Sequence, residues 1–271
     1  MLNFARVGAV LRREMQEIVK SRGLLLAIFL PPLLFTLLPL SGVVIIENTM
    51  QGIPDATRAS SDMGSLLQMM PELKTWTASE VTVFIILQQF LTFFLLMPLI
   101  ISLSIAAQSI IGEKQAKSLE PLLATPIKTI ELLFAKAITA MLPAIFATWA
   151  AFLIFIGVGR IVISSDRVYA ALLNPKWFIA MLILSPLLAL LSVSIAVILS
   201  SRVNDARAVQ QIGGFIVMPI VLLGVAQTMG LILLNSWTFI LGALIVAALD
   251  ILILRLGARM FQREKILTRW K

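Results

Sequence analysis

The stretch from residue 81 to residue 111, VTVFIILQQFLTFFLLMPLIISLSIAAQSII, contains no acidic or basic side chain. A helix that crosses a bilayer needs about 20 consecutive apolar residues, so this run can span a membrane and project beyond it. Strands of membrane β-barrels instead alternate apolar and polar side chains over about ten residues, and this run does not alternate. The stretch therefore predicts a transmembrane α-helix in an all-α membrane protein.

The composition of the whole chain supports the same class. The 271 residues are 59% hydrophobic and 13% charged, whereas about a quarter of the residues of a soluble domain are charged. We find no internal repeat and no low-complexity linker, so residues 1–271 are expected to form one transmembrane domain, with a tight turn near residues 235–236 between the last two spans. Six segments are long and apolar enough to span: roughly 24–46, 81–111, 130–158, 177–200, 212–234 and 236–254.

The first residues have a different pattern, typical of an amphipathic helix. Arg13 and Glu17 lie one helical turn apart on a charged face of segment 3–20. The apolar side chains that share the other face are Phe4, Val7, Leu11, Met15 and Ile18. Such a segment is predicted to lie on the membrane surface before the first span.

The basic residues indicate how the chain is oriented. Six spans place both termini on one side of the membrane, and loops on the cytoplasmic side of membrane proteins are enriched in Lys and Arg. With cytoplasmic termini, most of the 22 basic residues fall inside. The exceptions are Arg58, Lys74, Arg160, Arg167 and Lys176. Orientation therefore explains the net charge of +8 without a nucleic-acid partner.

Several kinds of chemistry are excluded by composition. The chain has no cysteine and no histidine, which removes disulfides, thiol nucleophiles, imidazole bases and Cys/His metal sites. We predict no catalytic residue and no metal ligand. The sequence also lacks the phosphate-binding pattern Gly-x-x-x-x-Gly-Lys-Ser/Thr, so ATP would have to be bound by another chain.

A few polar residues interrupt the predicted spans. Gln88 and Gln89 could line a path for a polar substrate or form hydrogen bonds between helices. Asp250 lies near the cytoplasmic end of the last predicted span. It could be a functional carboxylate, or it could pair with a base such as Arg255 or Lys136. In the fifth span, Pro219 is a further candidate for the translocation path.

The compact charged stretch GEKQAKSLEPLLATP, residues 112–126, separates the second span from the third. Ser118 can cap a short helix, and Thr125-Pro126 is suited to restart the chain into the next span. The leucines that would share one face of this short helix are Leu119, Leu122 and Leu123. A solvated or lipid-facing loop is the alternative, but exposed leucines on a short cytoplasmic helix favour a protein partner.

Two stretches of the chain resemble the type-2 class of ABC transporter permeases. Residues 110–138, IIGEKQAKSLEPLLATPIKTIELLFAKAI, contain the Glu-Lys pair, the Ser-Leu-Glu-x-Leu-Leu core and the Thr-Pro turn of that family. Residues 199–224, LSSRVNDARAVQQIGGFIVMPIVLLG, are similar to a second family stretch, a polar loop followed by a span with proline and glycine. Six spans and an N-terminal surface helix agree with the family, so the resemblance covers nearly the whole chain.

The resemblance implies a permease subunit of an ATP-driven exporter in the plasma membrane. The lack of Cys and His fits a prokaryotic membrane. A separate ATPase subunit would bind ATP and Mg, and a second permease copy or a homologue would complete the assembly. The segment 112–126 would be the coupling helix between the second and third spans, and the N-terminal helix would also touch the ATPase. The residues implied in that contact are Arg13, Glu17, Glu113, Lys114, Ser118, Leu119, Glu120, Leu122 and Leu123.

Two other classes of function stay open at this point. A secondary transporter or channel would need no ATP, but it is expected to carry mid-membrane carboxylates and inverted repeats. An integral membrane enzyme that modifies lipids is the other alternative, because residues 204–214, NDARAVQQIGG, are faintly similar to a lipid-headgroup transferase motif. The aspartates that would accompany that motif are missing.

Overall fold

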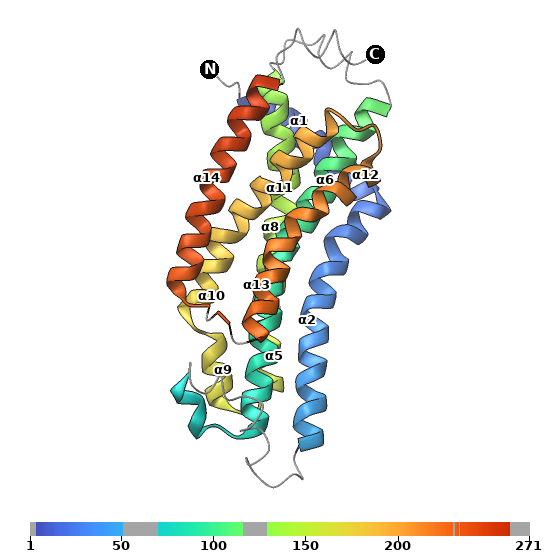
Figure 1. Ribbon diagram of the computed structural model, residues 1–271. Helices are drawn as coiled ribbons and strands as arrows, with labels where there is room; N and C mark the ends of the chain where they lie inside the picture. Colours follow the sequence, from blue (N-terminus) through green and yellow to red (C-terminus); the bar gives the residue numbers. More distant parts are fainter. Residues whose placement is uncertain (1–3, 51–69, 116–128, 230, 233, 261–271) are drawn as a thin grey trace.

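The computed structural model describes residues 4–50, 70–115, 129–229, 231–232 and 234–260 (Figure 1). Over these residues the chain is helical and has no β-strand. Among them, six helical segments are long and apolar enough to cross a membrane, which confirms the predicted all-α polytopic membrane protein. These segments are Arg22–Thr49, Ala78–Gln115, Glu131–Val162, Asp166–Ser200, Ala206–Gln227 and Ser236–Leu256. The predicted coupling helix lies mainly in residues 116–128, outside the described residues.

The N-terminal segment forms helix α1 (Phe4–Lys20), as its periodicity indicates. It packs against α2 (Arg22–Met50), which is the first span, and against α8 (Thr129–Val162), the third. Val7 and Ile18 are buried on its inner face. Arg13 and Glu17 form an exposed ion pair of 3.1 Å on its outer face. The helix therefore lies along one end of the bundle (Figure 1), and the side that carries Arg13 and Glu17 is exposed.

The second span consists of two helices, α5 (Ala78–Phe94) and α6 (Leu96–Gln115), separated at Leu95. Helix α5 begins with a capping box in which the Thr77 side chain accepts from the Glu80 N–H and the Glu80 carboxylate accepts from the Thr77 N–H. The interruption lies just before Pro98. A proline has no N–H for the carbonyl four residues earlier, here that of Phe94, so it interrupts a helix at this point.

The fourth span is assembled from several short pieces. Helices α9 (Asp166–Leu172) and α10 (Pro175–Ile179) lead into a π-helical segment, Ala180–Leu184, and then into α11 (Ser185–Ser200). The Trp149 indole N–H of α8 donates to the Met181 carbonyl in the π-helical segment at 2.8 Å. Helix α6 packs most extensively against α11 and α8, and it is the central helix of the bundle.

The fifth span differs from the sequence-based boundaries. Helix α12 (Ala206–Gly213) begins six residues before the predicted start, because the Asp205 side chain caps it by accepting from the N–H groups of Arg207 and Ala208. A 3-10 turn (Gly214–Val217) joins it to α13 (Met218–Thr228). The last span, α14 (Ser236–Met260), starts where the Asn235 side chain accepts from the Thr238 N–H at 2.8 Å. The connection between α13 and α14 is therefore longer than the predicted tight turn.

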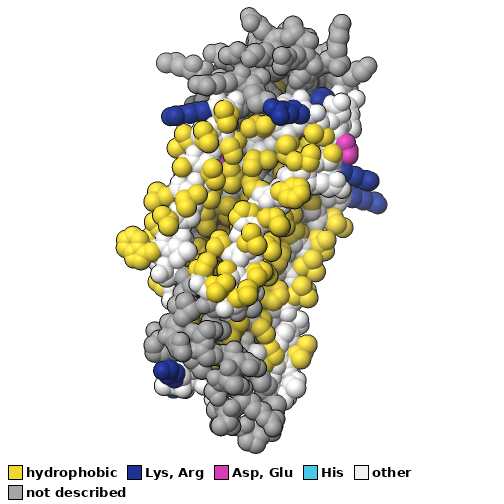
Figure 2. All heavy atoms as spheres, in the orientation of Figure 1, with side chains coloured by type: hydrophobic (Ala, Val, Ile, Leu, Met, Phe, Trp, Pro, Cys, Tyr) yellow, Lys and Arg dark blue, Asp and Glu magenta, His cyan; other side chains and the backbone are white. Residues whose placement is uncertain are grey.

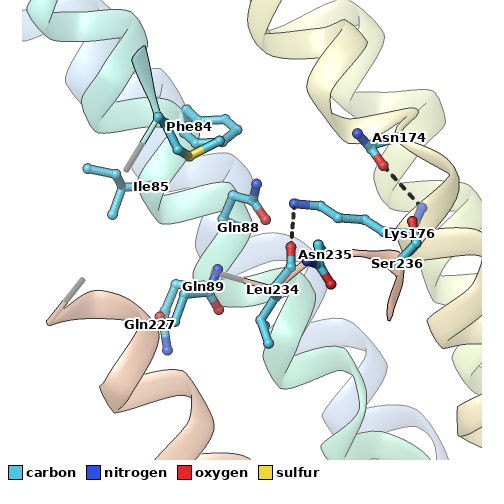
Figure 3. A pocket seen from close by; sticks show the side chains of 11 residues that line it. Phe84, Ile85, Gln88, Gln89, Asn174, Lys176, Gln227, Leu234, Asn235 and Ser236 are labelled. Atoms are coloured by element: carbon cyan, nitrogen blue, oxygen red, sulfur yellow. Dashed lines mark hydrogen bonds between the residues drawn. The ribbon is translucent and has the colours of Figure 1, made fainter. Parts of the chain in front are cut away.

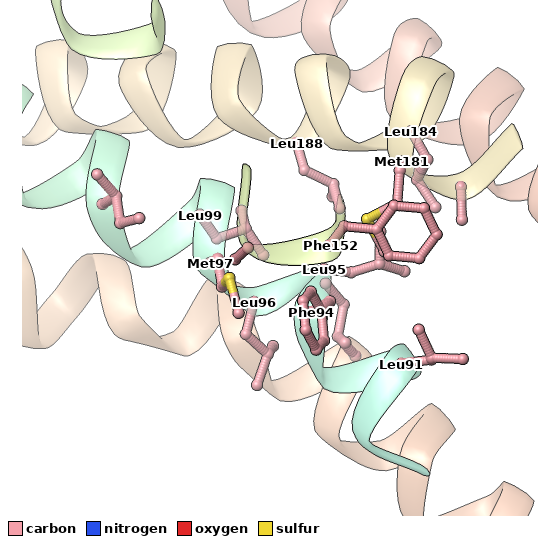
Figure 4. Packing of buried hydrophobic residues seen from close by; sticks show 14 of the residues in the cluster. Leu91, Phe94, Leu95, Leu96, Met97, Leu99, Phe152, Met181, Leu184 and Leu188 are labelled. Carbon is pink, nitrogen blue, oxygen red and sulfur yellow. The ribbon is translucent and has the colours of Figure 1, made fainter. Parts of the chain in front are cut away.

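A hydrophobic core surrounds the interruption in the second span (Figure 4). Phe94 and Met97 have no exposed surface, and the Phe94 ring centroid lies 5.2 Å from that of Phe155 and 6.3 Å from that of Phe152. Met181 and Leu188, from the fourth span, are also buried in this core. Packing of the second, third and fourth spans around the break thus holds the bundle together at mid-height.

The outer surface of the bundle is apolar. Figure 2 shows hydrophobic side chains covering the middle of the face in view, with Lys and Arg toward its ends. Exposed large side chains include Phe29 of α2, Phe146 of α8, Leu222 of α13 and Leu244 of α14, each more than half exposed. Apolar surface of this extent is what a lipid bilayer covers.

Candidate functional site

Three buried charged side chains and a half-buried serine meet where α1, α6 and α8 come together, and we refer to these four residues as the charge cluster. Lys136 Nζ donates to Glu14 Oε1 at 2.8 Å and to Ser109 Oγ at 2.8 Å. It also forms an ion pair with Glu113 Oε2 at 2.9 Å. The Ser109 hydroxyl in turn donates to Glu14 Oε2 at 2.7 Å. The side chains of Lys136, Glu14 and Glu113 are 4%, 4% and 6% exposed.

The charge cluster fastens the surface helix to both sides of the predicted coupling segment. Glu14 comes from α1, Ser109 and Glu113 come from the last turns of α6, and Lys136 comes from the second turn of α8. The last residue of α6 is Gln115 and the first of α8 is Thr129, so residues 116–128 connect two helices that the cluster holds together. Buried charges that satisfy one another fix the relative positions of the elements that carry them.

The end of α6 is also attached to the connection between the fourth and fifth spans. Lys114 Nζ donates to the Ser200 carbonyl at 3.4 Å, and the Gln115 side-chain amide donates to the Asn204 carbonyl at 3.0 Å. Ser200 and Asn204 lie at the connection between α11 and α12. Movement of the residues that follow Gln115 would therefore act on four spans at once.

The residues predicted to contact an ATPase subunit fall into three groups. Arg13 and Glu17 are exposed on α1 and lie beside a cavity, lined also by Glu113, between α1 and α6. Glu113 is buried and its carboxylate faces Lys136, not the surface. The remaining predicted contacts, apart from the half-buried Lys114, lie outside the described residues: Ser118, Leu119, Glu120, Leu122 and Leu123. The ATPase contact itself stays a prediction for all of them.

A second polar site lies toward the other end of the bundle, in a cavity that we call the amide pocket (Figure 3). Its volume is about 280 Å³. The polar residues that line it are Gln88, Gln89, Asn174, Lys176, Gln227, Asn235 and Ser236. Both glutamines predicted from the sequence therefore lie in one cavity, between α5, α10 and the connection from α13 to α14.

Two contacts build the amide pocket. Gln227 Oε1 accepts from the Thr92 hydroxyl at 2.8 Å, which joins α13 to α5. Helices α5 and α13 also approach closely at Gly224, where an added Cβ would lie 2.6 Å from Gln89 Nε2 and 2.7 Å from Phe93 Cε1. A larger side chain at residue 224 would thus push α13 away from the pocket.

The other two residues singled out inside the spans lie elsewhere. Pro219 is exposed in the first turn of α13 and does not line the amide pocket. Asp250 is 2% exposed, and neither of its carboxylate oxygens has a hydrogen-bond partner among the described residues. The expected pairing with Lys136 is wrong, because Lys136 is engaged by Glu14 and Glu113. The described residues show no ion pair between Asp250 and Arg255 either.

Two charged residues of these sites, Glu14 and Lys176, were not singled out as functional from the sequence, although a signal existed for Glu14. Glu14 lies seven residues after Val7 and four before Ile18, on the apolar face of α1, where a carboxylate is out of place. Lys176 was interpreted as an outer basic residue, but its side chain is buried beside the amide pocket. In the part of the chain that the structure describes, no group of acidic residues is placed to bind a metal ion.

Comparison with known proteins identifies the family. The sequence matches the family model described as ABC-2 family transporter protein over residues 8–265, which is nearly the whole chain. A search of curated proteins found no match. The six apolar spans fit the membrane component of such a transporter. The chain belongs to the ABC-2 transporter family and is a membrane permease component of an ABC transporter.

Proposed function

We propose that this chain is the permease subunit of an ATP-driven exporter, and that a separate ATPase subunit binds ATP and Mg. A second permease, either another copy or a homologue, lies beside it in the plasma membrane of a prokaryotic cell. Both termini face the cytoplasm in this proposal. The family supports a membrane component without a nucleotide site of its own, and α1 lies at the same end of the bundle as the end of α14 (Figure 1).

The observation that carries the proposal is the charge cluster. A segment moved by a motor protein transmits force only when the elements around it are rigidly connected. The buried Lys136 ties α1 to α6 and α8, the helices on either side of residues 116–128. A push on segment 112–126 would then move α1, α6 and α8 together. Because α6 also packs on α11, the displacement reaches the fourth span as well.

Copurification with the ATPase encoded beside this chain tests the proposal. The wild-type permease should bring down the ATPase, and the complex should hydrolyse ATP while the permease alone does not. Leu122→Glu, on the predicted leucine face, should abolish copurification because a buried leucine contact cannot accept a carboxylate. Lys74→Gln is the matched control, since Lys74 is exposed just before α5, at the opposite end of the second span from Gln115.

Two results would contradict the proposal. One is an ATPase complex that forms equally well with Leu122→Glu and with the double charge reversal of Glu113 and Lys114. The other is chemical labelling of cysteines introduced at residues 116–128 from outside intact cells. Either result would mean that the ATPase does not contact this segment on the cytoplasmic side of the membrane.

A further inference from the structure

The amide pocket contains a buried cation that has no charged partner among the described residues. Lys176 is 9% exposed, and its ammonium group donates to the Leu234 carbonyl at 3.2 Å (Figure 3). It also lies 5.2 Å from the centre of the Trp177 ring. Among the described residues that line the pocket, none is acidic. A lysine ammonium has three N–H donors, so two remain for a ligand. A buried charge is costly unless an opposite charge compensates it.

The pocket also contains a buried acceptor for which the described residues provide no donor. Gln88 is 8% exposed, and its Oε1 atom has no hydrogen-bond partner among the described residues. Figure 3 shows the Gln88 amide and the Lys176 ammonium pointing toward one another. A ligand that satisfied both groups would carry a negative charge with a hydrogen-bond donor close beside it. The other amide side chains can accept or donate around it.

A second span that is centred in the bilayer would place the pocket at the level of the lipid headgroups. The second span has 38 residues, and Met97 lies near its middle. Gln88 is nine residues before Met97, which corresponds to about 13 Å along a helix. Half of the hydrocarbon core is about 15 Å thick. With the span centred in the bilayer, Gln88 lies at the boundary between acyl chains and headgroups.

The lining of the pocket combines apolar and polar side chains, as a site between acyl chains and headgroups would. Met70, Phe84, Ile85 and Leu234 provide apolar surface beside the glutamines and Lys176. A volume of about 280 Å³ is close to the lower limit of pockets that bind small molecules, about 300 Å³. It suits a headgroup with the first carbons of its chains, and it is too small for a whole lipid.

We propose that the amide pocket binds a phosphate ester that carries a hydroxyl donor, the chemistry of a phosphatidylglycerol headgroup or of free glycerol phosphate. Lys176 binds the phosphate oxygens, and Gln88 Oε1 accepts from the hydroxyl. The inference deepens the proposed function by naming a ligand class for the permease. Because binding is tested on the purified chain without ATPase or ATP, a negative result here leaves the coupling proposal intact.

The experiment measures binding to the delipidated full chain in detergent. Dioleoyl phosphatidylglycerol, dioleoyl phosphatidylcholine and glycerol 3-phosphate are titrated separately, with native mass spectrometry and the apparent Tm as readouts. Phosphatidylglycerol should bind and raise the Tm. Phosphatidylcholine should not, because its choline cancels the charge and offers no donor. Binding of glycerol 3-phosphate alone would support the same chemistry with a ligand from water.

Two substitutions connect binding to the pocket. Lys176→Met and Gln88→Leu should each weaken phosphatidylglycerol binding at least about tenfold, the effect of losing one charge-assisted or buried hydrogen bond. The variant Lys74→Gln removes an exposed lysine outside the pocket and should bind as the wild type does. Gln88→Leu changes no charge, so it tests the pocket even if Lys176→Met fails to fold. The proposal is overturned if neither phosphate ester binds, if phosphatidylcholine binds equally well, or if folded variants keep wild-type affinity.

Discussion

Replacing Lys136 by methionine tests whether the charge cluster holds together the end of the bundle where α1, α6 and α8 meet. Methionine is about as long as lysine and leaves no cavity, so the change mainly removes the charge. Glu14 and Glu113 would then be buried near each other without the cation that lies 2.8 Å and 2.9 Å from them. Removing one partner of a buried ion pair costs about 3–5 kcal/mol, because the other charge is left uncompensated.

The expected loss of stability is large enough to measure. In proteins of about 150–250 residues, 1 kcal/mol corresponds to a shift of roughly 2–4 °C in Tm. Lys136→Met should therefore lower the apparent Tm by about 6 °C or more, measured by fluorescence-detected unfolding in detergent. Arg13→Met, on the helix that carries Glu14, is the control. Its partner Glu17 is 51% exposed, and an exposed pair contributes at most about 1 kcal/mol.

A triple variant separates the charge effect from packing. Glu14→Gln, Glu113→Gln and Lys136→Met together remove every formal charge of the cluster and keep the side-chain sizes similar. Replacing all members of a buried ion network is often neutral, so this variant should recover most of the Tm lost in Lys136→Met. The reasoning is refuted if Lys136→Met melts within about 1 °C of the wild type, or if the triple variant melts no higher than Lys136→Met alone.

Two further predictions concern the other spans. Asp250→Asn should keep or raise the apparent Tm, because it removes a carboxylate that is 2% exposed and has no hydrogen-bond partner among the described residues; a fall of several degrees would mean that the charge is stabilising. Gly224→Ala should destabilise by about 1–3 kcal/mol, because its Cβ would lie 2.6 Å from Gln89 and 2.7 Å from Phe93. Gly214→Ala, which meets nothing within 4 Å, is the matched control, and equal Tm values for the two alanine variants would contradict the close approach.

Sequence patterns predicted the spans and the surface helix well, because both depend on long-range averages of hydrophobicity. The ends of spans that are set by a single capping side chain were harder to predict from the sequence. Asp205 starts the fifth span within a polar stretch, and the apolar residues around Leu231 and Leu234 resemble the end of a span although α13 ends at Thr228. At such positions, a side chain that accepts hydrogen bonds from two backbone N–H groups determines where the helix begins more strongly than hydropathy does.

The candidate sites depend on contacts between residues far apart in the sequence. Lys136 follows Glu14 by 122 residues, and nothing local in either segment shows that they meet. Glu14 did carry a signal, as a carboxylate on an apolar helix face. Lys176 carried none, because a lysine beside a predicted span is usually interpreted as a basic residue at the membrane surface. Its burial results from Leu234, Asn235 and Ser236 folding over it.

Because α5 and α6 are separated at Leu95, the second span consists of two shorter helices and not of one continuous helix. Since Pro98 already lacks the N–H that would bond to Phe94, changing the angle between the two halves breaks no further hydrogen bond at that point. A change of that angle would move Glu113 relative to Gln88, and it would require Phe94 and Met97, which have no exposed surface, to repack. A joint at mid-bilayer would allow this transporter to alter one mouth of its pathway independently of the other.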